Sequence, residues 1–161
     1  MGVLKPMQEI SKVAVITGGA SGLGKMAATA YVKNNVRVAI IDINEENGNA
    51  TVEELKEFND VAFFKCNVMN IEEIYSTVDT IAERFGRIDI LLNSAGITDH
   101  NRLTGISEEL WDRFMSLDLT APYFMAQACA KYMAKAGGGR IVNFSSILST
   151  VTDGKHHLYG A

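Results

Sequence analysis

A glycine-rich turn at residues 17–24 constrains this chain more than any other feature. It reads Thr-Gly-Gly-Ala-Ser-Gly-Leu-Gly, follows an apolar β-like run at 13–16 and leads into a helical pattern. Its glycines allow a tight turn, and they let backbone N–H groups approach an anion at a helix N-terminus, where the helix dipole favours negative charge. A purely structural turn is the alternative. The flanking strand and helix, together with an acid downstream, favour a nucleotide phosphate site.

Short β-branched runs alternate with longer amphipathic runs from residue 12 onward, without an internal repeat or a linker. This alternation is typical of βαβ units and predicts an α/β fold, a doubly wound parallel sheet with helices on both faces. Residues 1–161 are expected to form a single domain. The expected strands are 13–17, 36–41, 62–66, 88–92 and 140–144, and the expected helices are 23–34, 45–58, 71–85 and 108–136.

Asp42 ends the second predicted strand, about 20 residues past the glycines. A carboxylate there can accept both hydroxyls of an adenosine ribose and would repel a 2′-phosphate. A solvated aspartate at a strand end is the alternative reading. Neither Ser21 nor Ile43, which flank the turn and the strand end, supplies a cation for a 2′-phosphate. The pattern therefore favours NAD over NADP.

Small and polar residues follow three further predicted strands. Asn67 comes after the third strand, residues 93–96 read Asn-Ser-Ala-Gly after the fourth, and Ser145 and Ser146 come after the fifth. Doubly wound folds bind ligands at the carboxyl ends of their strands, although a plain tight turn would give a similar sequence at 93–96. His100 is expected to be a solvated loop residue, because no second metal-type residue lies at a ligand spacing from it. No metal site is expected.

The longest helical pattern, at 108–136, contains a proline at position 122. Ser107 is expected to cap this helix, and acids follow in its first turn. Proline has no N–H to bond the carbonyl four residues back, so we expect a kink and a free carbonyl at Asp118. Asp118 is thus a functional candidate through its backbone as well as its side chain.

The composition limits the classes of partner that this chain is expected to bind. The 161 residues are 47% hydrophobic and carry a net charge of −4 without long charged runs, so no nucleic-acid footprint or polybasic membrane patch is present. No run approaches the length of a membrane span. The two cysteines, Cys66 and Cys129, look like buried thiols of a reducing compartment. A soluble, cytoplasmic protein is expected.

Four motifs together resemble the short-chain dehydrogenase/reductase family over nearly the whole chain. They are Thr-Gly-x-x-x-Gly-x-Gly at 17–24, Asn-Ser-Ala-Gly at 93–96, Asn-Phe-Ser-Ser at 143–146 and Tyr-Gly-Ala at 159–161. The resemblance implies a Rossmann fold and nicotinamide-linked interconversion of a secondary alcohol and a ketone. It also implies that Ser146 orients the substrate oxygen and that Tyr159 transfers its proton.

The resemblance implies further site residues. Asp118 stands where the family often has a catalytic asparagine, and Asn67 stands where the family often has an aspartate near the adenine. Small-molecule substrates are the expected partners. The expected cofactor-binding residues are Thr17, Gly18, Ser21, Gly22, Leu23, Gly24, Asp42, Asn67, Val68, Asn93, Ala95 and Gly96.

Two other functions are alternatives to that of a dehydrogenase. The family's lysine lies four positions after its tyrosine, whereas the 161 residues end two positions after Tyr159. The chain is therefore expected to lack the family's C-terminal strands, and it could be a truncated module that binds a dinucleotide or a partner without chemistry. A methyltransferase that uses the same glycine turn is disfavoured by Ser146 and Tyr159. An unpaired edge beside the fifth strand favours self-association, so a homo-oligomer is expected.

Overall fold

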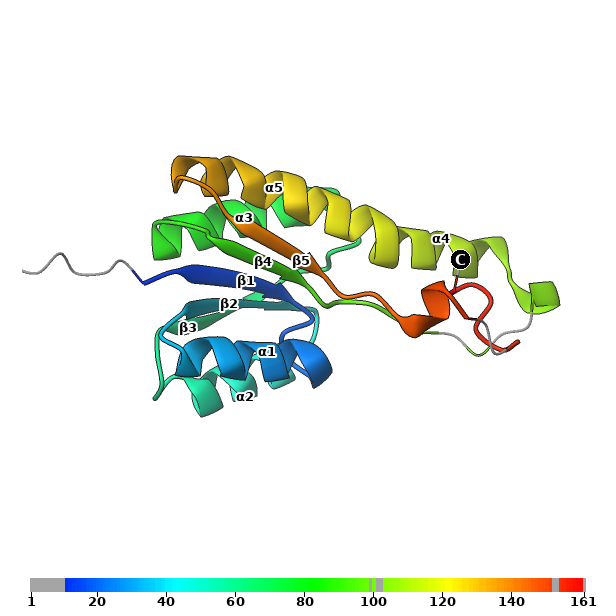
Figure 1. Ribbon diagram of the computed structural model, residues 1–161, viewed down its shortest axis with the longest axis horizontal. Helices are drawn as coiled ribbons and strands as arrows, with labels where there is room; N and C mark the ends of the chain where they lie inside the picture. Colours follow the sequence, from blue (N-terminus) through cyan, green and yellow to red (C-terminus); the bar gives the residue numbers. More distant parts are fainter. Residues whose placement is uncertain (1–10, 99, 101–102, 152–153, 161) are drawn as a thin grey trace, which may run out of the picture.

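A five-stranded parallel sheet forms the centre of the molecule, as shown by a computed structural model that describes residues 11–98, 100, 103–151 and 154–160 (Figure 1). The strand order is β3-β2-β1-β4-β5, so the chain crosses over between β3 and β4 to the other side of β1. This order is that of a Rossmann fold and confirms the predicted fold class. The strands are β1 (Val13–Thr17), β2 (Arg37–Asp42), β3 (Val61–Lys65), β4 (Ile90–Asn93) and β5 (Arg140–Asn143).

The parallel register brings the strand ends together. Thr17 lies opposite Ile41 on one side and Asn93 on the other, and Asn93 in turn lies opposite Asn143. Because all five strands run the same way, the segments that follow them share one edge of the sheet. The order reverses between β1 and β4, and at such a switch point doubly wound sheets bind their ligands.

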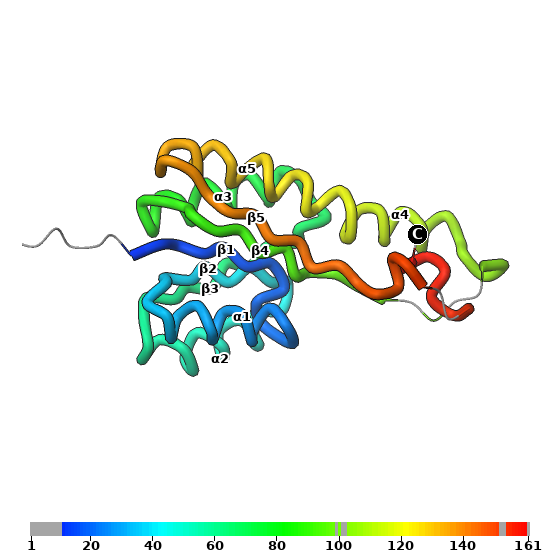
Figure 2. The backbone as a smooth tube through the Cα atoms, in the orientation of Figure 1, coloured from blue at the N-terminus to red at the C-terminus, as the bar shows by residue number. Residues whose placement is uncertain are grey.

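Helices cover both faces of this sheet, as Figures 1 and 2 show. On one face lie α1 (Gly22–Lys33) and α2 (Glu45–Leu55). The other face is covered by α3 (Ile71–Phe85) and α5 (Ala121–Lys135), and α4 (Glu108–Phe114) precedes α5. Most predicted bounds agree with these to within two residues. One exception is the predicted helix at 45–58, since α2 already ends at Leu55.

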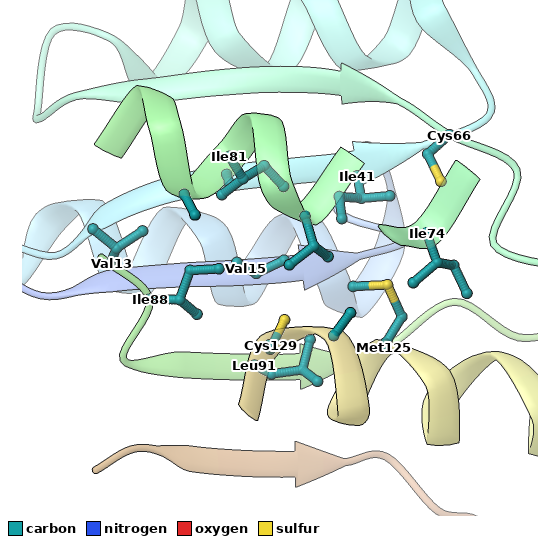
Figure 3. Close-up of a cluster of buried hydrophobic side chains, with 14 of the residues drawn as sticks. Val13, Val15, Ile41, Cys66, Ile74, Ile81, Ile88, Leu91, Met125 and Cys129 are labelled. Carbon is teal, nitrogen blue, oxygen red and sulfur yellow. The ribbon is translucent and has the colours of Figure 1, made fainter. Parts of the chain in front are cut away.

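The central strand β1 is buried along its whole length and alternates between two cores. Val13 and Val15 face α3 and α5, in the cluster of Figure 3, whereas Ala14 and Ile16 face the α1 and α2 side. This burial on both faces explains why the strands are continuous apolar runs. The free thiols of Cys66 and Cys129 are buried in the first cluster, and burial raises the pKa of Cys129 to about 12.

Helix ends follow the capping residues that the sequence indicates. Ser107 accepts a hydrogen bond from the Leu110 N–H at the start of α4, which confirms the predicted cap. Gly86 ends α3 in the left-handed conformation, at φ 79°, as predicted. Asn44 and Asn70 cap α2 and α3 in the same way as Ser107 caps α4.

The helical pattern predicted at 108–136, with an interruption at Pro122, forms two α-helices and not one kinked helix. A π-helical segment, Met115–Thr120, separates α4 from α5, and Pro122 lies in the first turn of α5. The N–H of Ala121 bonds the carbonyl of Ser116, five residues back. Because Pro122 lacks an N–H, the regular ladder cannot continue through it, and the wider turn before it absorbs the mismatch. The free carbonyl at Asp118 stays a prediction.

The edge strand β5 is exposed along all four of its residues. Ile141 and Val142 are 44% and 41% exposed, and Phe144, just beyond the strand, is 46% exposed. Strand β4 is its only neighbour in the sheet that the structure describes. The predicted unpaired edge is therefore present, and it is apolar.

Candidate functional site

A cleft of about 1020 Å³ opens along the carboxyl edge of the sheet. It extends from the glycine turn and the end of β2 to the segment that follows β5. Ten of the twelve expected cofactor-binding residues line it, and so do the three expected catalytic residues. The lining cofactor-binding candidates are Gly18, Ser21, Gly22, Leu23, Asp42, Asn67, Val68, Asn93, Ala95 and Gly96.

Two of the three motif glycines lie where a side chain would collide with the backbone. At Gly24 an added Cβ would come within 2.2 Å of the Gly18 carbonyl oxygen. Gly18 has a φ of +64°, and a Cβ there would lie 2.9 Å from the Cα of Ala95. Gly24 is thus needed for the close approach of α1 to the turn and does not line the cleft. Gly22, at φ +49°, faces open space.

Thr17 is buried behind the cleft wall and is absent from its lining. Its hydroxyl oxygen accepts hydrogen bonds from the backbone N–H groups of Ser94 and Ala95, each at 3.1 Å. The side chain therefore ties the end of β1 to the segment after β4. Thr17 thus supports the two loops that line the cleft.

Both carboxylate oxygens of Asp42 accept backbone hydrogen bonds. Oδ2 accepts from Ala20 in the glycine turn at 3.2 Å, and Oδ1 accepts from Asn44 at 3.0 Å. These bonds hold the carboxylate against the turn, and each oxygen keeps a second lone pair for a hydroxyl donor. Asp42 also lines the cleft, as a ribose-binding acid must.

Asn67 and Val68 line the cleft beside the end of β3. The Asn67 side-chain oxygen accepts from the Met69 N–H at 3.1 Å, and its backbone N–H donates to Glu73 at 2.9 Å. Val68 is 8% exposed and packs in the core beneath this wall. The pair offers an apolar surface next to a fixed amide, which suits a heteroaromatic base.

Asn93 and Asn143 join β4 to β5 at the edge of the sheet. The Asn93 Nδ2 donates to Asn143 Oδ1 at 2.8 Å, and Asn93 Oδ1 is buried without a hydrogen-bond partner among the described residues. A buried amide oxygen at a cleft is an acceptor suited to a ligand or a water. Sequence reasoning missed Asn143, although its place at a strand end beside Asn93 is a signal that the parallel register supplies.

The Asp118 side chain contacts the segment that follows β4. Its Oδ1 accepts from the Ile97 N–H at 3.2 Å, and a Cβ on Gly96 would lie 3.3 Å from the same oxygen. Burial raises the pKa of Asp118, and the Ile97 hydrogen bond counteracts part of that rise. The π-helical segment that follows α4 thus presents a partly buried carboxylate to the cleft wall.

Ser146 and Tyr159 both line the cleft, although 12 residues separate them in the chain. Ser146 begins a short 3-10 turn, Ile147–Ser149, and its hydroxyl oxygen accepts from the Leu148 N–H at 3.2 Å. Its hydroxyl hydrogen remains to donate elsewhere. Tyr159 is half-buried beside the buried Leu158.

Charge is sparse along the cleft. Among its described lining residues the charged side chains are Asp42, Asp118 and Arg113, which sequence reasoning did not select. Two lysines are engaged with acids outside the cleft: Lys25 on α1 pairs with Glu54 at 2.6 Å, and Lys65 at the end of β3 pairs with Glu45 at 2.9 Å. Asp42 therefore brings a negative charge to the cleft, and neither lysine lines it.

No helix among the described residues is long and apolar enough to cross a membrane. Within those same residues, histidine, cysteine, aspartate and glutamate side chains form no group of three or more that could hold a metal ion.

Comparisons with known proteins agree with this geometry. A sequence model of the short chain dehydrogenase family matches residues 12–161. D-threitol dehydrogenase of Mycolicibacterium smegmatis is 38% identical over 151 residues, a match that covers 93% of this chain and 58% of that protein. Secoisolariciresinol dehydrogenase of Forsythia intermedia is 35% identical over 150 residues, which cover 92% of this chain and 54% of that protein.

A solved structure from the same family is also similar to this chain. A short chain dehydrogenase from Mycobacterium smegmatis is similar with a TM-score of 0.88 and 27% sequence identity, and the match covers 93% of this chain and 63% of that one. The chain thus spans between half and two thirds of the relatives that it matches. Family match, sequence identity and fold all agree, and the chain belongs to the short-chain dehydrogenase family.

Proposed function

We propose that this chain forms the cofactor-binding part of an NAD-dependent oxidoreductase that interconverts a secondary alcohol and a ketone. One observation carries the proposal: the glycine turn and Asp42 line the same cleft as Ser146 and Tyr159. A dinucleotide needs a phosphate cradle and a ribose acceptor, and alcohol chemistry needs a proton-transfer group near the far end of the same ligand.

The residues of the cleft fit the dinucleotide. The close packing at Gly24 and the left-handed turn at Gly18 and Gly22 bring backbone to the start of α1, where unpaired N–H groups and the helix dipole favour a pyrophosphate. Asp42 is held by two backbone N–H groups in an orientation that can accept ribose hydroxyls. Asn67 and Val68 would flank the adenine. The bound nicotinamide would accept or return the hydride.

NAD is favoured over NADP because a 2′-phosphate would meet the Asp42 carboxylate. Two like charges at contact distance interact by several kcal/mol at an effective dielectric of about 20. Lys25 and Lys65 pair with Glu54 and Glu45 and do not line the cleft. Arg113, on α4, is the cation among the described residues that line the cleft.

At the substrate end, Ser146 would donate a hydrogen bond to the substrate oxygen, and Tyr159 would exchange its proton with that oxygen. A neutral hydroxyl donor can stabilise a developing alkoxide without adding charge of its own. A tyrosine is a weak base at neutral pH, so a nearby positive charge is needed to favour its ionised form. Secondary alcohols, including polyols, are the first substrates to test, because two relatives are named as dehydrogenases of D-threitol and glycerol.

NADH formation from a panel of secondary alcohols tests the proposal, with the 161-residue chain beside a longer chain that continues through the lysine. The longer chain should form NADH, and Tyr159→Phe and Ser146→Ala should each lower its turnover. Ser149→Ala, a neighbouring serine that also lines the cleft, is the matched control and should keep turnover within about threefold. Unchanged turnover in Tyr159→Phe would refute the assigned proton-transfer role.

A further inference from the structure

The side chains of Asn93 and Asn143 connect the two strands that lead into the cofactor-binding and catalytic segments. Asn93 ends β4, Asn143 ends β5, and the two residues lie opposite each other in the parallel register. The Asn93 Nδ2 donates to the Asn143 Oδ1 at 2.8 Å. Strand β4 continues into residues 94–96 and β5 continues into Ser146, all of which line the cleft. This hydrogen bond therefore lies at the start of both segments.

Asn93 is a firmly held partner for this contact. Its side chain is 5% exposed, and its Nδ2 also donates to the carbonyl oxygen of Pro122 at 3.4 Å. Pro122 lies in the first turn of α5. An asparagine amide nitrogen carries two N–H groups, and here each of them has an acceptor. Asn143 is thus tied to the start of α5 as well as to β4.

The end of β5 has few other contacts with the sheet. All four residues of β5 are exposed, and β4 is its only neighbour among the described strands. The Phe144 N–H donates to the Asn93 carbonyl at 3.1 Å. The hydrogen bonds of Ser146 run to Leu148 and Ser149 within its own 3-10 turn. They orient Ser146 within the turn, whereas the contacts at the end of β5 place the turn relative to the sheet.

We propose that Asn143 is a positioning residue for Ser146. The proposal rests on the proposed dehydrogenase function, in which Ser146 donates to the substrate oxygen. Such a donor must lie within hydrogen-bond distance of the reacting oxygen, and a small displacement of it lowers the rate of the chemical step. Asn143 acts through the acceptor oxygen that it offers to Asn93, which fixes the end of β5 three residues before Ser146.

Turnover of the longer chain that continues through the lysine tests this role. Asn143→Ala removes the acceptor and should lower kcat at least about tenfold, while the KM for NAD stays within about threefold. Asn143→Asp keeps an oxygen acceptor on a side chain of the same shape and should restore kcat to within about threefold of the parent. Arg140→Ala is the matched control on β5, since Arg140 bonds the adjacent Gly139 carbonyl, and it should keep kcat within about twofold.

Amide hydrogen exchange in the 161-residue chain provides a measurement that needs no turnover. The Phe144 N–H should exchange at least about threefold faster in Asn143→Ala than in the parent or in Asn143→Asp. If the longer chain forms no NADH, the proposed function fails, and the exchange rates still decide whether Asn143 holds the end of β5. An unchanged kcat in Asn143→Ala of an active chain would overturn the proposal. So would an equal loss in Asn143→Asp, or unchanged Phe144 exchange in Asn143→Ala.

Discussion

The carboxylate of Asp118 accepts a hydrogen bond from the backbone N–H of Ile97 at 3.2 Å. This contact joins the π-helical segment before α5 to the segment that follows β4, two parts of the chain that wall the same cleft. Burial raises the pKa of the Asp118 carboxyl, while the Ile97 N–H partly offsets that rise. An asparagine, common at this position in the family, could accept the same bond without carrying charge.

Asp118→Asn should therefore preserve the contact, and Asp118→Ala should break it. In a longer, active chain the asparagine variant is expected to keep turnover within about tenfold, which corresponds to 1.4 kcal/mol. The alanine variant should lose more, because the Ile97 N–H is left without its acceptor. Turnover at saturating substrate is the measurement. A loss of several thousandfold in Asp118→Asn would show instead that the carboxylate itself does chemistry.

The close packing at Gly24 predicts that even a methyl side chain there lowers the stability of the protein. Gly24→Ala would place a methyl group 2.2 Å from the Gly18 carbonyl oxygen, so α1 must move away from the turn. We expect a loss of about 3 kcal/mol in the free energy of unfolding, at the upper end for overpacking. Gly105→Ala is the control, because a Cβ there meets nothing within 4 Å, and it should change stability by less than about 0.5 kcal/mol. Urea unfolding measures the stability of the two variants. Equal stability of Gly24→Ala and Gly105→Ala would contradict the inferred clash.

The lowered pKa of Asp89 predicts that the stability of the protein depends on pH. Burial by itself raises the pKa of this carboxyl, but the hydrogen bonds and charge of Arg87 and the hydrogen bond from the Val13 N–H outweigh it and lower the pKa. A pKa lowered in the folded state stabilises the protein above the unfolded value of about 3.9, and this contribution is lost as pH falls through the folded value.

Asp89→Asn should therefore be less stable than the parent by about 2 kcal/mol at pH 7, the scale of a hydrogen bond to a charged group. The difference in stability between the parent and Asp89→Asn should shrink as the pH falls and the Asp89 carboxyl of the parent becomes protonated. Urea unfolding across pH 2–7 measures it. A difference that stays constant over this range would exclude the charged form as the source of the stability.

The apolar edge at β5 predicts self-association of the 161-residue chain. Val142 is 41% exposed on an edge strand, and a charge on such a strand opposes pairing between molecules. Sedimentation velocity at several concentrations should show concentration-dependent association in the parent and less of it in Val142→Lys. Val151→Lys introduces the same charge at a residue that is 56% exposed outside the sheet, and it should associate like the parent. A monomeric parent at every concentration would contradict the prediction.

Local patterns in the sequence were sufficient to predict the sheet and most of the cleft. Val13 to Thr17 could be recognised as a strand because it is an apolar, mostly β-branched run, and Asp42 could be recognised because it ends a strand at a known distance from a glycine turn. Ser107 and Gly86 set helix ends through their own side chain and backbone, so their roles also follow from local sequence.

Other features depend on contacts between distant segments. The hydroxyl of Thr17 bonds the Ser94 and Ala95 N–H groups because β1 and β4 are neighbours, and Asn93 meets Asn143 because β4 and β5 are in register. The π-helical segment depends on how α4 and α5 together avoid the missing N–H of Pro122. Hydrophobic periodicity and residue spacing carry no information about such pairings, so sequence reasoning missed them.

Titration of the 161-residue chain with NADH and with NADPH, followed by nicotinamide fluorescence, tests the central claim most directly. Asp42 lies in the cleft with both oxygens oriented by backbone N–H groups, so NADH should bind saturably and at least about tenfold tighter than NADPH. Asp42→Ala should weaken NADH binding and narrow this ratio, whereas Glu57→Ala, an exposed acid outside the cleft, should leave both affinities unchanged. Equal or tighter binding of NADPH by the parent chain, or no saturable binding of either cofactor, would contradict the account.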